Sequence, residues 1–99
     1  MDLKGYQRDY LSRKAHGLQP VVQIGKAGLT EQVAAAVDKA LEDHELIKVK
    51  FVNSKEEKDD LARVAADKTG AVLVRVIGNV AIYYRYQSDP DKRVVHLPK

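Results

Sequence analysis

Apolar side chains recur along this chain with two different periods. Residues 3–16, 30–44 and 54–69 carry them at the three- and four-residue intervals of helices that bury one face. Residues 18–24, 45–52, 71–77 and 80–87 instead alternate between apolar and polar positions or run apolar, as strands do. The predicted order of elements is therefore α-β-α-β-α-β-β.

Local signals mark several of the element ends. Thr30 is a natural N-cap for the second helix, and Ser54 with Glu57 has the spacing of a capping box for the third. Gly70 stands at the C′ position of that third helix. The pair at positions 78–79, Gly-Asn, has the glycine-first order of a type II′ turn and predicts a hairpin between the last two strands.

The connections between the strands predict a sheet of mixed direction. Helical crossovers favour parallel neighbours, whereas a hairpin is antiparallel. The 99 residues contain no internal repeat, low-complexity run or Pro/Gly-rich linker. We therefore predict one domain over residues 1–99, an α/β sandwich with a mixed four-stranded sheet. The stretch RVVHL near the C-terminus is a candidate for an additional short strand.

The composition, 44% apolar and 31% charged, is that of a globular protein. No apolar run approaches the ~20 residues of a membrane span, and the N-terminal residues lack the apolar segment of a signal peptide. The absence of cysteine removes disulfides and thiolate chemistry and fits a reducing compartment. We expect a soluble, cytoplasmic monomer that uses no cofactor or metal and does not associate with membranes.

The net charge of +3 is distributed unevenly. Residues 1–26 carry five Lys or Arg against two acids, and residues 71–99 do the same, whereas residues 27–70 carry seven against ten. If the two ends meet in the fold, they form a basic surface backed by an acidic one, which suits a polyanionic partner. The alternative is chance variation between solvated faces.

A GxxG sequence, formed by Gly25, Lys26, Ala27 and Gly28, lies where the first strand gives way to the second helix. It is neither a P-loop nor a dinucleotide fingerprint, because it lacks both G-K-[ST] and G-x-G-x-x-G. Backbone N–H groups ahead of a helix favour an anion, missing side chains allow a sugar–phosphate backbone to approach, and Lys26 adds a charge. The structural alternative is that the glycines only make a tight turn.

A second basic feature is predicted on the sheet. Lys48 and Lys50 share one face of their strand, and we expect Arg75 and Arg85 to join them there, together with Tyr83. An uncovered face of this kind would be a platform for single-stranded RNA. The alternative is that these side chains bind no ligand and only make an exposed face soluble.

Cations of the first helix complete the predicted basic surface. We expect Lys14, with Arg8 or Arg13, to lie on the same side of the molecule as Lys26, because both chain ends are basic. The loop alone would provide little positive field for a polyanion.

No catalytic constellation is evident. His16, His44 and His96 are far apart and lack the spacing of a helical metal site, and no serine lies in a nucleophile elbow. The acids fall mostly on the solvent faces of two helices. We therefore expect a protein that is not an enzyme.

Several sequence blocks follow one another along the chain: AHGLQPVVQIGKAGLT, HELIKVK, TGA…VIG, YR and the terminal LPK. In this order they resemble the YhbY-like CRM domain (chloroplast RNA splicing and ribosome maturation), and the resemblance covers essentially the whole chain. The resemblance implies an RNA-binding module whose GxxG loop matches residues 25–28. It also implies a fold related to the C-terminal domain of bacterial translation initiation factor three. Stand-alone bacterial members are associated with precursors of the large ribosomal subunit, so the resemblance implies ribosomal RNA or pre-large-subunit particles as the partner.

One alternative function stays open, a protein-interaction adaptor that docks through its sheet face or its acidic helices. Salt dependence separates the two, because phosphate binding weakens steeply with salt and apolar docking does not.

Overall fold

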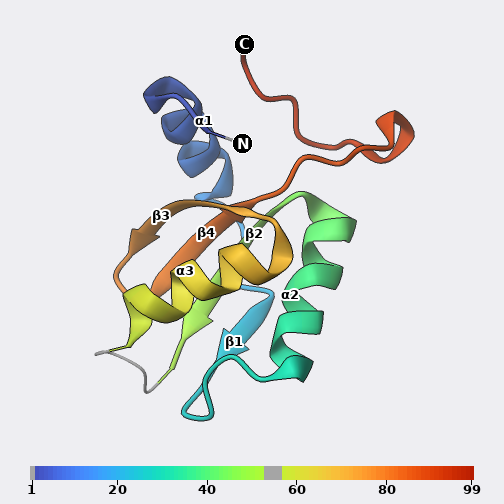
Figure 1. Cartoon of the computed structure of the whole chain (residues 1–99). Coiled ribbons are helices and arrows are strands. Elements are labelled where there is room, and N and C mark those ends of the chain that lie inside the picture. Colours follow the sequence, from blue (N-terminus) through green and yellow to red (C-terminus); the bar gives the residue numbers. More distant parts are fainter. Residues whose placement is uncertain (1, 53–56) are drawn as a thin grey trace.

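The computed structural model describes residues 2–52 and 57–99, and in these residues four strands form one mixed sheet (Figure 1). In chain order the elements are α1 (Gly5–Ala15), β1 (Val22–Ile24), α2 (Glu31–His44), β2 (Leu46–Phe51), α3 (Lys58–Thr69), β3 (Val72–Ile77), β4 (Val80–Tyr84) and a 3-10 turn, η1 (Pro90–Lys92). The predicted order α-β-α-β-α-β-β is confirmed. None of the described helices is long and apolar enough to cross a membrane.

The strands lie in the order β1-β2-β4-β3. β1 runs parallel to β2, whereas β4 is antiparallel to both of its neighbours. The hairpin between β3 and β4 turns at Gly78, whose φ of 59° is the positive value that a glycine-first turn requires. The predicted mixed sheet and its hairpin are confirmed.

Alternation along the strands gives the sheet two apolar faces. One face packs on α2 and α3 through Ile24, Ile47, Val49, Phe51, Ala81 and Tyr83. The inner side of α3 is alanine at positions 62, 65 and 66, so the helix axis can approach the strands closely. The other face packs on α1 and the C-terminal segment through a second cluster, Leu11, Ala15, Leu46, Val74, Ile82, Tyr84 and Val95.

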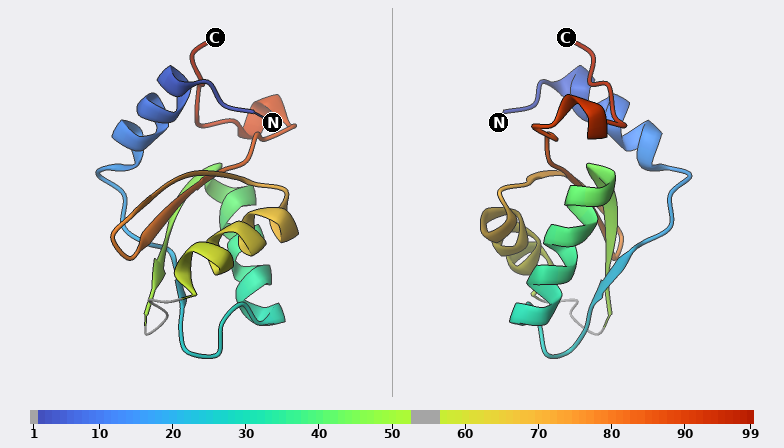
Figure 2. Two further views of the ribbon diagram at one scale, coloured as in Figure 1. Left: turned by 60° about the vertical axis from the view of Figure 1, so that its left-hand side comes forward. Right: turned by 90° about the vertical axis from the view of Figure 1, so that its right-hand side faces the viewer.

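The two ends of the chain meet on that second face. Gln7 Nε2 donates to the carbonyl oxygen of Pro98 at 2.8 Å, and Leu3 and Leu97 pack on the same apolar cluster. Figure 2 shows α1 and the C-terminal segment together at one end of the molecule. The two chain ends therefore lie together on the α1 side of the sheet, and α2 and α3 lie on the opposite side.

Several predicted element ends differ from the structure. The first helix begins at Gly5 rather than at residue 3, and the first strand has three residues rather than seven. Thr30 is the N-cap of α2, as predicted, and its Oγ1 accepts a hydrogen bond from the backbone N–H of Val33 at 3.1 Å. Ser54 of the predicted capping box lies outside the described residues, and Glu57 is the N-cap of α3 without a side-chain bond.

The prediction of a C-terminal strand over RVVHL is wrong. The backbone N–H groups of Val94 and Val95 donate to a side chain, Glu45 Oε1, the second at 3.2 Å, rather than to a neighbouring strand. Glu45 is only 1% exposed and has a φ of 64° at the junction of α2 and β2. A buried carboxylate thus holds the C-terminal segment against the sheet.

Candidate nucleic-acid interface

The GxxG turn, residues 25–28, joins β1 to α2 at the end of the molecule farthest from α1 (Figures 1 and 2). The backbone N–H of Gly28 donates to the carbonyl oxygen of Gly25 at 2.9 Å and closes a β-turn. The two central residues, Lys26 and Ala27, are exposed. The turn therefore presents one cation and almost no side-chain bulk to solvent.

The two glycines of the turn have different structural roles. Gly28 has a φ of 76°, a left-handed conformation that side chains rarely adopt, so the backbone itself favours glycine there. Gly25 lies outside that region, and a Cβ built on it would meet no atom within 4 Å. Conformation therefore accounts for Gly28, whereas the space next to Gly25 stays open on the surface.

The start of α2 makes a mixed contribution to anion binding. Unpaired N–H groups and the helix dipole favour a negative charge at this end. Thr30 Oγ1 already occupies one of these N–H groups, and Glu31 in the first turn provides a competing carboxylate. Positive charge at the turn therefore comes mainly from the side chain of Lys26.

Three of the four predicted sheet cations share the α1 side of the sheet. Lys48 and Arg75 both pair with Ile82 of β4, from its two sides, so the three residues form one row across the sheet. A β-bulge between residues 73 and 75 is what turns Arg75 to this side. Lys50 lies two residues nearer to the GxxG turn than Lys48 and is exposed.

Two of these cations also hold α1 in place. Lys48 Nζ donates to the carbonyl oxygens of His16 and Leu18, each at 3.2 Å, and so caps the C-terminal end of the helix. Arg75 Nη2 forms an ion pair with Asp9 of α1 at 3.0 Å. Within residues 2–52 and 57–99, the side chain of Lys50 is exposed and makes no hydrogen bond or ion pair.

The prediction that Arg85 and Tyr83 share this face is wrong. Tyr83 points to the opposite side, where it is fully buried and its hydroxyl donates to the carbonyl oxygen of Ala62 at 2.8 Å. Burial raises the pKa of Tyr83 and keeps the phenol protonated. The pleat of β4 directs both odd-numbered side chains toward α2 and α3, because Arg85 follows Tyr83 by two positions.

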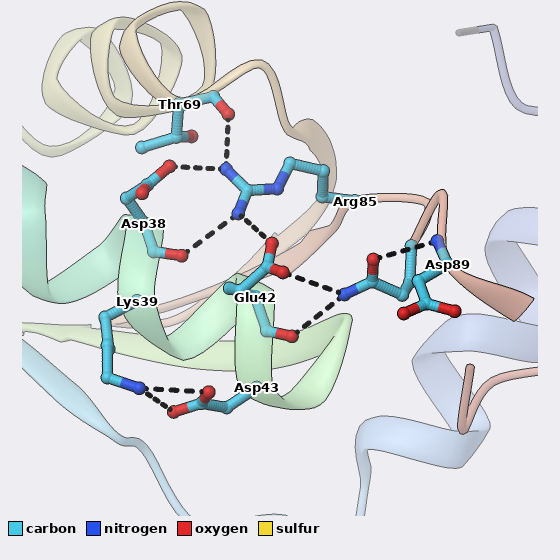
Figure 3. A network of polar contacts seen from close by, with 8 residues as sticks. Asp38, Lys39, Glu42, Asp43, Thr69, Arg85 and Asp89 are labelled. Atoms are coloured by element: carbon cyan, nitrogen blue, oxygen red, sulfur yellow. Dashed lines mark hydrogen bonds and ion pairs between the residues drawn. The ribbon is translucent and has the colours of Figure 1, made fainter. Parts of the chain in front are cut away.

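Arg85 lies between the two acidic helices (Figure 3). Its Nη1 donates to Asp38 Oδ1 at 2.6 Å and to the carbonyl oxygen of Thr69 at 2.8 Å. Its Nη2 donates to the carbonyl oxygen of Asp38 at 3.1 Å and lies 3.6 Å from a carboxylate oxygen of Glu42. One guanidinium thus joins the last turn of α3 to the middle of α2.

The α1 cations were predicted on the same side of the molecule as Lys26, but the structure places them far from it. In every view α1 and the GxxG turn lie toward opposite ends of the molecule (Figures 1 and 2). Arg8 Nη1 donates to the carbonyl oxygens of Leu73 and Val74 at the bulge of β3, both at 2.9 Å. Lys14 lies 6.0 Å from the centre of the Tyr10 ring. Arg13 is exposed.

The basic groups of the α1 side therefore form an elongated band rather than one patch. It begins at α1 with Arg13, passes Lys48 and Lys50 along β2, and reaches the GxxG turn, since β1 and β2 end side by side there. We call this arrangement the basic band. Among the described residues, no group of three or more His, Cys, Asp or Glu could hold a metal ion.

The model of one protein family, described as the CRS1 / YhbY (CRM) domain, matches residues 3–85. The chain belongs to the CRM family. The match spans α1, the GxxG turn and the whole sheet, and the C-terminal segment held by Glu45 follows it.

Similar CRM proteins align over nearly their full length. The chain is 37% identical to the "Probable RNA-binding protein YqeI" of Bacillus subtilis, with 97% of this chain and 99% of the relative covered. It is 41% identical to an "RNA-binding protein" of Haemophilus influenzae, with 94% and 92% covered. The solution structure of the hypothetical protein SAV1595 from Staphylococcus aureus superposes with a TM-score of 0.82 at 36% identity, covering 98% of this chain and all of that one.

The placement of Arg85 leads to a stability prediction. Replacing Arg85 with alanine should lower the free energy of unfolding by about 1–3 kcal/mol, because several charge-assisted hydrogen bonds are lost. Arg85→Lys should recover only part of this loss, since an ammonium group cannot reproduce the guanidinium fork. Urea denaturation measures both variants. Unchanged stability in Arg85→Ala would show that this network does not hold α2 and α3 together.

Proposed function

We propose that this CRM protein binds RNA through phosphate contacts along the basic band, with the GxxG turn at one end. The distribution of charge about the sheet supports the proposal, because exposed cations lie on the α1 side, whereas α2 on the opposite side carries four acids against one lysine. A strand of phosphates can lie along such a band while the opposite side repels it. The similar CRM proteins are named as RNA-binding proteins, which supports RNA as the polyanion.

At the turn, the groups that contact a phosphate are the Lys26 ammonium and the backbone around Gly25. The open space at Gly25 lets a phosphate oxygen approach the backbone, and the exposed Lys26 supplies a charge-assisted contact. Contacts of this kind are to the backbone of the nucleic acid and carry no base preference. Binding at the turn is therefore expected to depend strongly on salt and weakly on sequence.

For the target we propose ribosomal RNA, in precursors of the large ribosomal subunit. The support is the family itself, whose stand-alone bacterial members are associated with those particles. A monomer in the cytoplasm that recognises a folded RNA, with no chemistry of its own, fits this role. Bases that are unstacked in loops and bulges would be the place where sequence preference arises.

The first test changes the exposed residues of the turn. Lys26→Gln should flatten the plot of log affinity against log salt by about 0.7 units for a single-stranded RNA, because one phosphate contact is lost. Ala27→Asp should weaken binding more strongly, since it brings a carboxylate to the phosphate. Fluorescence anisotropy over a series of salt concentrations measures both. Gly28 is unsuitable for this test, because its positive φ strains the backbone when another residue replaces it, so a loss of binding could reflect a loss of stability.

The matched control for Lys26 is Lys68→Gln. Lys68 is an exposed lysine on α3, on the acidic side of the sheet. Lys68→Gln changes the net charge by the same amount as Lys26→Gln, and it should leave the salt slope unchanged. If both turn variants are folded and bind as the unmodified protein does, the turn is not a phosphate site. If the unmodified protein does not bind RNA even at low salt, the adaptor function replaces the proposed one.

The second test addresses the target. Crosslinking the protein to RNA in cells and sequencing the attached fragments should enrich a small number of sites in large-subunit ribosomal RNA, which would also be found in precursor particles. Fragments spread over cellular RNAs in proportion to their abundance would contradict a ribosomal target. RNA binding measured on the purified protein would be unaffected by that outcome.

A further inference from the structure

An open polar pocket of about 450 Å³ lies between α1 and β3, at the end of the basic band away from the GxxG turn. Its lining residues are Asp9, Ser12, Arg13, His16 and Arg75. The first four stand at positions i, i+3, i+4 and i+7 of α1 and its C-cap, so they share one side of the helix. Arg75 faces them from the sheet, turned there by the bulge in β3.

The pocket has an excess of unused hydrogen-bond donors. Arg13 is exposed, and its side chain forms no hydrogen bond or ion pair with any residue that the structure describes. Arg75 uses Nη2 on Asp9, and a guanidinium has five N–H donors in all. The buried Ser12 Oγ has no hydrogen-bond partner within the described ranges. Two exposed guanidinium groups therefore face one carboxylate, and beside them the Ser12 hydroxyl is buried without a partner among the described residues.

The pocket lies near the C-terminal end of α1, but the helix dipole does not make it unfavourable for an anion. Helix C-termini carry a partial negative charge that disfavours anions. Here Lys48 Nζ donates to the carbonyl oxygens of His16 and Leu18, so a full positive charge offsets that end of the dipole.

From this set of groups we propose that the pocket is a second phosphate subsite, which holds a backbone phosphate of the same RNA that contacts the GxxG turn. Guanidinium groups in pairs match phosphate oxygens, and a serine hydroxyl is a common further donor. A metal ion would be repelled by the two arginines, and no Phe, Tyr or Trp is among the residues that line the pocket. The subsite extends the proposed function, since it concerns the same RNA.

Asp9 has a definite role in this subsite. Its carboxylate orients Arg75 through the 3.0 Å ion pair but repels the phosphate that Arg75 would bind. The two side chains are 57% and 42% exposed, so the pair is weak and can open or share Arg75 with a ligand. Removing the charge of Asp9 should therefore tighten RNA binding, an effect that a purely structural pair would not produce.

The test uses the full chain and a single-stranded RNA of about 12 nucleotides, long enough to bind along an extended surface. Arg13→Gln should weaken binding about tenfold and flatten the salt slope by about 0.7 units. Asp9→Asn should strengthen binding several-fold. Ser12→Ala should weaken binding without lowering the melting temperature, because its hydroxyl has no partner to lose in the free protein.

The Asp60–Arg63 pair on α3 provides the matched control. It is a similar exposed ion pair, with 3.3 Å between Nη2 and Oδ1, on the opposite side of the sheet. Asp60→Asn and Arg63→Gln change the net charge as the pocket variants do, and both should leave RNA affinity unchanged. Equal effects at the two pairs would mean that only net charge matters and would overturn the subsite.

The roles proposed for the pocket and for the GxxG turn can be contradicted separately. If Lys26→Gln weakens binding while Arg13→Gln and Ser12→Ala do not, the pocket is not a phosphate subsite and the proposed function stands. If Asp9→Asn weakens binding, the subsite is also overturned. If the pocket variants weaken binding and the turn variants do not, the subsite holds and the turn is excluded. With both sites in use, Lys26→Gln and Arg13→Gln should lower the salt slope additively.

Discussion

The alternation of side chains along β2 and β4 determines most of what this molecule presents to solvent. These two central strands have apolar residues on both faces, so each face of the sheet must be covered. α2 and α3 cover one face along its length. The other face receives one helix and the C-terminal segment, and it stays open near the hairpin, where Ile77 is 58% exposed and Lys50 lies in the same row across the sheet, on the other side of Val80. The cations of β2 and β3 thus lie on one side of the sheet and the acids of α2 on the other.

Features encoded by neighbouring residues could be predicted from the sequence. The element order, the Thr30 cap and the hairpin turn at Gly78 each depend on residues within a few positions of one another. Their hydrogen bonds close locally, so the local pattern is sufficient. The GxxG turn could be predicted for the same reason. Only the structure shows that the backbone conformation requires glycine at Gly28, whereas a side chain at Gly25 would meet no neighbouring atom.

Features that depend on distant partners could not be predicted. Arg75 faces the predicted side, but a bulge in β3 that the sequence did not indicate turns it there. Arg8 of α1 donates to the two carbonyl oxygens at this bulge. Arg85 looks in the sequence like another surface cation, but its partners are in α2, 47 residues earlier, and at the end of α3. The role of Glu45 could not be predicted either. In the sequence, a buried acid that binds the backbone of the C-terminal segment looks the same as an acid in solvent.

RNA lying along the α1 side of the sheet, from the pocket under α1 to the GxxG turn, is the central claim. Backbone amide NMR titration with a single-stranded RNA of about 12 nucleotides tests it most directly. The account predicts that the largest shift changes fall at residues 25–28, at Lys50 and on the face of α1 that carries Arg13. Shift changes concentrated on the outer faces of α2 and α3, with the α1 side unaffected, would contradict it.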